Sequence, residues 1–300
     1  MRALAVVVPL VIACGPTSNR DNPDGGTSGD GKTSDAGQCE EVVDVVFVLD
    51  TSSSMDFVLT KLEQQIAQVV TASNMVAADA HFGLIVFQDN HFLDNTGQNG
   101  VVHTSAMSLQ TAFRFYRDNF TANNRNPGDG LSGPTTQNPI CEENSLDALY
   151  AAAKDFPWRD NATRVVILAT DDTFLERPDN YGDRDGDGLT NKTDFPREGH
   201  YPAARTLSET TTALRDEKVR VFSFSRKTPP GFLERCGTPR RFTWEHITDG
   251  WTTTYKGQPP IPMQTDGGDY DLAQVQAGML SLAETINEVV LDSHCNPILL

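Results

Sequence analysis

The chain of 300 residues has a formal net charge of −17 at pH 7 and a hydrophobic content of 38%, with 8% aromatic residues. This apolar content can form the core of one large domain or two small ones, since length alone sets only a soft limit. The acidic balance argues against nucleic acid as a partner, because proteins that bind nucleic acid present basic surfaces. It favours a soluble exported protein or a protein that binds cations.

The N-terminus resembles a bacterial lipoprotein signal. It begins with one positive charge and an apolar run that ends at Ala13, which is too short to span a bilayer. Cys14 follows directly, as in the lipobox, where a signal peptidase cuts before a cysteine that is then acylated. We expect residues 1–13 to be a lipoprotein signal peptide; the alternative is an ordinary signal peptide with an incidental cysteine. The resemblance implies anchoring to the bacterial cell envelope through lipid on Cys14. Gly15, in place of a retention acid, favours the outer membrane in a cell that has one.

Residues 14–38 are expected to form a flexible tether. After the lipidated cysteine they consist mainly of Gly, Ser, Thr, Asn, Asp and Pro, with no aromatic or large aliphatic side chain. Such a segment cannot bury enough apolar surface to fold, and as a coil it reaches about 25–30 Å. We therefore place the folded domain at residues 39–295, with a short tail at residues 296–300.

The first strand is predicted at Val42–Leu49, an apolar run broken only by Asp44. Such a run is typical of a strand in a parallel sheet that is covered by helices on both faces. The run ends in the pattern D-x-S-x-S, formed by Asp50, Ser52 and Ser54. In such sheets ligands bind beyond the carboxyl ends of the strands, and carboxylate and hydroxyl oxygens suit a small hard cation such as Mg²⁺. The alternative is a polar turn that caps the next helix, because Asp and Ser are favoured there.

The later segments alternate between strand and helix patterns. Further strands are predicted at residues 82–87, 164–172 and 219–224, with an edge strand at 101–109 and one more near 242–247. Helices are predicted at residues 58–70, 109–120, 146–156, 202–217 and 272–289, where apolar residues recur every three or four positions. This alternation predicts an α/β fold. We expect a doubly wound, mostly parallel central sheet flanked by helices, with one antiparallel edge strand.

Two strand ends together resemble a known family. The first strand ends in D-x-S-x-S, and the strand at residues 164–172 ends in the letters LATDD. A chain with both motifs, here over about residues 40–292, is similar to the von Willebrand factor A-type (VWA) domain. The resemblance implies a metal-ion-dependent adhesion site in which Asp50, Ser52, Ser54 and Asp171 hold Mg²⁺ or Mn²⁺. Taken alone, Asp171 could also be a helix-capping acid.

The family also uses a threonine on the loop before its third helix. Thr136 is the candidate here, beside Thr135, although Pro139 and Cys141 separate both from the predicted helix. Hydroxyl ligands are neutral, so an octahedral cation keeps most of its charge and attracts one more anionic oxygen. In this family that oxygen comes from solvent or from an Asp or Glu of a protein partner, and the resemblance implies the same kind of partner for this chain.

A second metal motif is the stretch DRDGDGLTNKTD at residues 183–194. Its spacing is similar to the calcium loops of dockerins and thrombospondin type 3 repeats, with acids at positions one, three and five and a glycine at six. The expected Ca²⁺ ligands are Asp183, Asp185, Asp187, the backbone carbonyl of Leu189, Asn191 and Asp194. The alternative is a solvated acidic turn.

Four cysteines remain after the lipidated one: Cys39, Cys141, Cys236 and Cys295. An even number in an exported protein suggests disulfides, and four cysteines allow three pairings. Cys39 and Cys295 flank the predicted domain, so a bond between them would join its ends and leave Cys141 with Cys236.

Nothing in the sequence predicts an enzyme. The six histidines have no zinc-ligand spacing, and the serines at residues 52–54 lie in neither a G-x-S-x-G nor an S-x-x-K motif. The leading hypothesis is an envelope-anchored VWA binding or adhesion module that recognises a protein ligand through a divalent cation. One alternative is a structural or assembly component whose metals only stabilise the fold. The other is a hydrolase built on the serines, which would lose its activity in Ser52→Ala but keep it in chelator.

Overall fold

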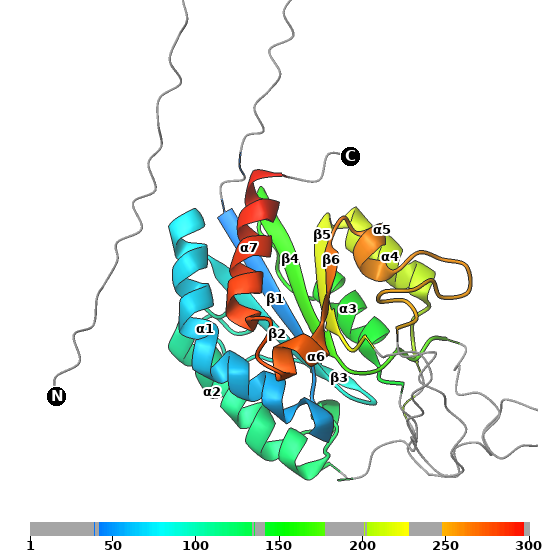
Figure 1. The fold of residues 1–300 in the computed structure, drawn as a ribbon. Coiled ribbons are helices and arrows are strands. Elements are labelled where there is room, and N and C mark those ends of the chain that lie inside the picture. The colour runs from blue at the N-terminus through cyan, green and yellow to red at the C-terminus, as the bar shows by residue number, and fades with distance from the viewer. Residues whose placement is uncertain are drawn as a thin grey trace, which may run out of the picture. The chain divides into compact units, whose positions relative to one another are not determined.

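In the part of the chain that the structure describes, six strands form one sheet in the order β3-β2-β1-β4-β5-β6 (Figure 1). All neighbouring strands are parallel except β3, which pairs antiparallel with β2. The chain builds the sheet outward from β1 in one direction and then, from β4, in the other. This is the predicted doubly wound α/β fold with one antiparallel edge strand. The strands are β1 Val42–Asp50, β2 His81–Phe87, β3 His91–Leu93, β4 Ala162–Thr170, β5 Val219–Ser225 and β6 Gly268–Asp271.

This computed structural model describes residues 39, 42–133, 135, 142–177, 201, 203–227 and 248–296. They belong to one compact unit, Gly37–Leu300. The predicted signal peptide, the tether, the calcium loop, the strand near 242–247 and the tail after residue 296 lie outside the described residues. Within the described ranges, no helix is long and apolar enough to cross a membrane.

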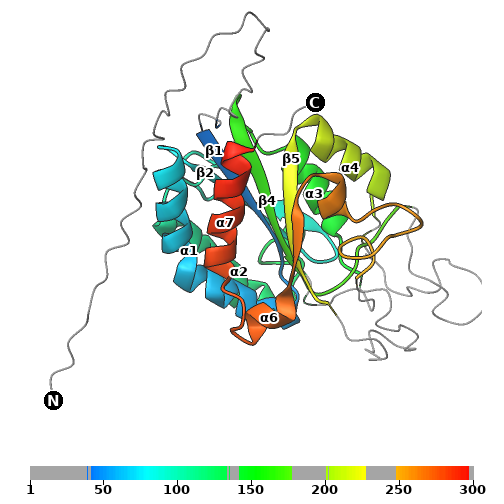
Figure 2. The same ribbon diagram turned by 45° about the horizontal axis from the view of Figure 1, so that its top comes forward.

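Helices cover both faces of the sheet (Figures 1 and 2). Val45 and Phe47 of β1 pack in the cluster that includes α1, α2 and α7, whereas Val46 and Val48 pack in the cluster that includes α3 and α4. Burial of both faces explains why β1 has a continuous rather than an alternating apolar pattern. The helices are α1 Asp56–Val76, α2 Ala106–Asn119, α3 Ser145–Lys154, α4 Leu207–Asp216, α5 Ile261–Gln264, α6 Leu272–Gln276 and α7 Leu282–Cys295. Short 3-10 turns lie at η1 Ser53–Met55, η2 Thr121–Asn123 and η3 Pro127–Asp129.

Asp44, the one charge inside the apolar run of β1, is fully buried and paired with Arg159. Arg159 donates from its backbone N–H to Oδ2 of Asp44 at 2.8 Å and from Nε to Oδ1 at 2.8 Å. A buried carboxylate needs such compensation, because the loss of hydration is costly. The interruption of the apolar run is therefore a buried ion pair rather than a break in the strand.

The predicted edge strand at residues 101–109 is wrong. That stretch contributes a bridge between His103 and Phe82, and Ser105 then caps α2 by accepting a hydrogen bond from the N–H of Ser108. His103 is buried, with Nδ1 2.7 Å from the hydroxyl of Ser108 and Nε2 3.0 Å from Oδ2 of Asp94. These side-chain bonds fix the segment as a connection into α2. The edges of the sheet are β3 and β6 instead.

Two predicted helices have different limits. The helix expected at residues 202–217 begins at Leu207, where Thr206 and Glu209 form a capping box. The helix expected at residues 272–289 is divided into α6 and α7, with Gly278 between them at φ +73°. Glycine adopts this left-handed conformation without the steric cost that other residues incur, so the chain can turn where the apolar period alone predicted one continuous helix.

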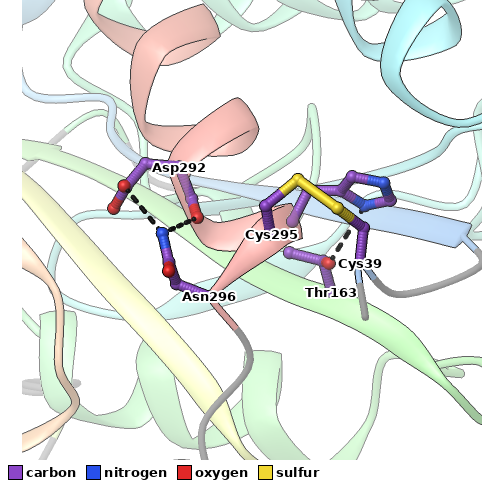
Figure 3. The surroundings of a disulfide bond; sticks show 6 residues. Cys39, Thr163, Asp292, Cys295 and Asn296 are labelled. Atoms are coloured by element: carbon purple, nitrogen blue, oxygen red, sulfur yellow. Dashed lines mark hydrogen bonds between the residues drawn. A yellow bond between two sulfur atoms is a disulfide. The ribbon is translucent and has the colours of Figure 1, made fainter. Parts of the chain in front are cut away.

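A disulfide joins Cys39 to Cys295 at the end of α7 (Figure 3). It connects a residue just before β1 with the last helix, as expected for a bond that joins the ends of the domain. The other two cysteines, Cys141 and Cys236, lie outside the described residues.

Candidate metal site

The candidate site lies where β1 and β4 end, between the two halves of the sheet. The chain turns in opposite directions after these neighbouring strands, and open α/β sheets bind ligands at such a switch point. Asp50 is the last residue of β1, and Asp171 directly follows β4. The topology thus brings together two carboxylates that are far apart in the sequence.

Asp50 is held in place from two sides. The backbone N–H of Ser52 donates to Oδ1 of Asp50 at 2.7 Å, and the hydroxyl of Thr170 donates to Oδ2 at 3.0 Å. Asp50 is 1% exposed. The carboxylate is therefore fixed beneath the turn that follows β1.

The two serines connect the turn after Asp50 to Asp171. The hydroxyls of Ser52 and Ser54 are 3.0 Å apart, and the hydroxyl of Ser54 donates to Oδ1 of Asp171 at 3.1 Å. Neither Ser52, at the start of η1, nor Met55, at the start of α1, makes a side-chain capping bond. The alternative that D-x-S-x-S only caps the next helix is thus not supported, since its hydroxyls contact one another and Asp171.

Burial and like charge act on both acids. Burial and the nearby charge of Asp171 raise the pKa of Asp50 to about 7. Burial also raises the pKa of Asp171, while the bond from Ser54 and the charge of Arg226 oppose that rise. Nη1 of Arg226 lies 3.7 Å from Oδ2 of Asp171, so one cationic side chain reaches the edge of the site. Two buried carboxylates in this position favour a bound cation.

Glu143 is a third acid of the site, and the sequence motifs did not identify it. It is 8% exposed, and its Oε2 has no hydrogen-bond partner among the described residues. Burial and the charges of Asp50, Asp89, Asp172 and Asp171 raise the pKa of its carboxyl well above the usual range. The available signal was the pair of acids at residues 142–143, directly before the helix predicted at residues 146–156.

The remaining predicted ligands do not join this group in the described residues. Thr135 is exposed, and Thr136 lies outside the described residues, as do all ligands of the calcium loop, residues 183–194. One further set of potential ligands, Cys39, His294 and Cys295, has atoms within 4.8 Å of one another. Its two sulfurs form the disulfide, and the thiolate rather than the disulfide sulfur is the metal ligand.

The donors at the strand ends fit a small hard cation. They are two carboxylates and two hydroxyls, the oxygen ligands that Mg²⁺ and Mn²⁺ prefer. No three acids of the described residues bring their oxygens within 4.8 Å of one another, so the hydroxyls of Ser52 and Ser54 are needed to complete a compact ligand set. A cavity of about 190 Å³ opens beside them, lined in part by Ser54, Asp171 and Arg226.

Comparison with known proteins finds similar solved structures. No protein-family model matches the sequence, and no curated protein matches it. An aerotolerance-related membrane protein from Bacteroides fragilis NCTC 9343 is 14% identical, with a TM-score of 0.43 over 83% of this chain and 99% of its own. The conserved hypothetical protein BatB from Bacteroides thetaiotaomicron is 16% identical, with a TM-score of 0.40 over 82% of this chain and 98% of its own.

A third solved structure, the von Willebrand factor type A protein from Catenulispora acidiphila, is 12% identical, with a TM-score of 0.43. The match covers 85% of this chain and 43% of that one. Similarity at this level leaves the function to be argued from the site itself.

Proposed function

We propose that this chain is a VWA-type binding module that recognises a protein ligand through a divalent cation. The observation that carries the proposal is the hydrogen-bonded series at the switch point, from Asp50 through Ser52 and Ser54 to Asp171. Mg²⁺ or Mn²⁺ is the proposed ion. Bound there, it would offer a partner's carboxylate a coordination position, because two of the protein ligands are neutral hydroxyls.

The proposed activity is binding rather than catalysis. The hydroxyl of Ser52 contacts that of Ser54, and Ser54 donates to a carboxylate. Activation of a serine nucleophile needs an adjacent general base, which in most such enzymes is a histidine. The serine bonds observed here suit ligands of a cation better.

We further propose that Cys14 anchors the module to the bacterial cell envelope and that residues 14–38 hold it away from the membrane. The lipobox-like end of the apolar run supports the anchor, and the polar composition supports the tether. Labelling with a fatty-acid analogue tests the anchor. The label is expected on the wild-type protein and is expected to be absent from Cys14→Ser.

A structural role is the second candidate function. It is favoured by the burial of Asp50, which is only 1% exposed and accepts hydrogen bonds inside the fold. An ion held mainly by such groups would stabilise the domain without meeting a partner. This candidate predicts that Asp50→Ala unfolds the protein and that no ligand depends on the cation.

Affinity capture from envelope extract, with and without EDTA, separates the two candidates. Wild-type protein is expected to retain a partner in Mg²⁺ and to release it in EDTA. Asp50→Ala is expected to remain folded and to capture nothing, while Asp56→Asn, at an exposed position at the start of α1, should behave as wild type. Loss of folding in Asp50→Ala, with no partner released from the wild type by EDTA, would favour the structural role.

A further inference from the structure

The segment before α3 passes over the end of β1. The N–H of Asn144 donates to the carbonyl of Gln88, just after β2, at 2.7 Å. On the other side, the N–H of Glu143 donates to the carbonyl of Thr173, after β4, at 3.1 Å, and Leu175 donates back to the carbonyl of Glu143 at 2.9 Å. Because β1 lies between β2 and β4, a segment bound to both exits lies above the exit of β1, where Asp50 ends the strand.

Unsatisfied polar atoms gather along this segment. Oε2 of Glu143 and both polar atoms of the Gln88 side chain are buried and have no hydrogen-bond partner among the described residues. Oδ1 of Asn144 and the hydroxyl of Ser145 are also buried and have no hydrogen-bond partner among the described residues. Buried polar groups in native proteins nearly always have a partner, so a cluster of exceptions indicates an ion or ordered water at that place. The charge of Asp50 is also one of the causes that raise the pKa of Glu143, in agreement with the position of this segment above the exit of β1.

We propose that Glu143 tunes the affinity of the cation site for the ion and for an external carboxylate, by adding a third negative charge near the ion without coordinating it directly. This inference rests on the proposed function. A cation bound at Asp50 and Asp171 favours the ionised form of Glu143, and the resulting charge acts in two opposite directions. It strengthens binding of the cation, and it weakens the attraction of the loaded site for an external carboxylate, because three negative charges exceed the two positive charges of the ion.

Mn²⁺ and acetate are suitable probes, because Mn²⁺ can be followed by water-proton relaxation and acetate is the simplest carboxylate. The full chain would carry Asp185→Ala/Asp187→Ala, so that the predicted calcium loop does not contribute. In this background Glu143→Gln keeps the size of the side chain and removes its charge. Glu217→Gln is the matched control, since Glu217 pairs with Arg164 and Lys154 at the opposite end of β4.

For Glu143→Gln we expect Mn²⁺ affinity to fall about tenfold, the size seen when groups around metal ligands are removed. We expect acetate to bind the Mn²⁺-loaded variant about threefold or more tightly than the loaded parent, because one opposing charge is gone. Glu217→Gln should change neither affinity. Unfolding of the variant would lower both affinities, so it cannot produce a fall in Mn²⁺ affinity together with a rise in acetate affinity.

Three results would overturn the inference or its basis. Unchanged Mn²⁺ and acetate affinities in Glu143→Gln would show that its charge does not act on the ion. A parallel fall in both affinities would show that Glu143 only supports the structure. If the parent chain itself binds no Mn²⁺, the proposed function fails. If the parent binds Mn²⁺ and its Asp50→Asn variant does not, the proposed function stands even where Glu143→Gln has no effect.

Discussion

The hydroxyl of Ser54 donates a hydrogen bond of 3.1 Å to Oδ1 of Asp171, a residue 117 positions later in the chain. The bond connects the turn after β1 with the end of β4, across the switch point of the sheet. It brings the D-x-S-x-S motif and the second acidic strand end into one site. The function proposed for this chain depends on that connection.

Without a divalent cation, the free energy of unfolding should fall as the pH rises from about 4 to 7. The pKa of Asp50 is raised from 3.8 to about 7 in the folded protein, and that of Asp171 is raised as well. Between the two values for Asp50 the native state holds a proton that the unfolded state has lost, so each pH unit lowers the free energy of unfolding by up to about 1.4 kcal/mol. Thermal unfolding in EDTA should therefore give a lower midpoint at pH 8 than at pH 5.5. Asp50→Asn should reduce this slope; equal slopes in both proteins would contradict the role of Asp50.

Removal of the Cys39–Cys295 disulfide should destabilise the domain. The bond closes a loop with a sequence separation of 256 residues, and disulfides of long loops stabilise mainly by restricting the unfolded chain. We expect Cys39→Ser/Cys295→Ser to lower the free energy of unfolding by about 2–4 kcal/mol. Urea denaturation without reductant measures this and leaves the other cysteines in their native state. An unchanged midpoint would mean that the bond does not form in solution.

Loss of Arg159 alone should lower the free energy of unfolding more than loss of both members of the buried ion pair. Arg159→Met leaves the fully buried Asp44 carboxylate without its partner, and breaking such a pair typically costs about 3–5 kcal/mol. The double variant Asp44→Val/Arg159→Met removes the unpaired charge, so it should be more stable than Arg159→Met. Chemical denaturation of both variants tests this. A double variant less stable than Arg159→Met would show that the pair does more than neutralise Asp44.

Calcium should bind the loop at residues 183–194 with low affinity. Extracellular calcium modules bind in the range of about 10⁻⁴–10⁻³ M, and a hundredfold excess over the dissociation constant stabilises a fold by about 2.7 kcal/mol. Calorimetric titration of wild type should show one more Ca²⁺ ion than titration of Asp185→Ala/Asp187→Ala. The same number of ions and the same heat in both would show that the loop is not a calcium site.

The parts of the site that the sequence predicts are those fixed by local pattern. A strand buried on both faces has a continuous apolar run, and the polar residues that end it mark the edge of the sheet where ligands bind. Asp50, Ser52, Ser54 and Asp171 were grouped from these strand ends and from the resemblance to the VWA domain, and hydrogen bonds connect them in the structure. The alternation of strands and helices predicted the α/β class, and the resemblance to the VWA domain implied the doubly wound topology.

Features set by tertiary contacts could not be predicted in this way. In the sequence, Glu143 is simply an acid near the start of a helix, and its backbone bond to Thr173 is what places it above β1. Likewise, residues 101–109 have strand-like composition, but the bonds of His103 to Asp94 and Ser108 make them a connection. The backbone contact that positions Glu143 is with a residue distant in the sequence. The role of His103 depends on side-chain contacts that local composition does not reveal.

The central claim is tested most directly by calorimetric titration with Mg²⁺ of the chain carrying Asp185→Ala/Asp187→Ala, with and without Asp50→Asn. The carbonyl oxygen of asparagine can accept from the N–H of Ser52, and its N–H₂ group can donate to the hydroxyl of Thr170, which accepts as well as donates, so the fold should persist while the charge is lost. Circular dichroism checks that it does. The parent chain should bind one Mg²⁺ ion, and the Asp50→Asn chain should bind none over the same concentrations. Binding of one ion with the same heat and affinity in both chains would contradict a cation site at the ends of β1 and β4.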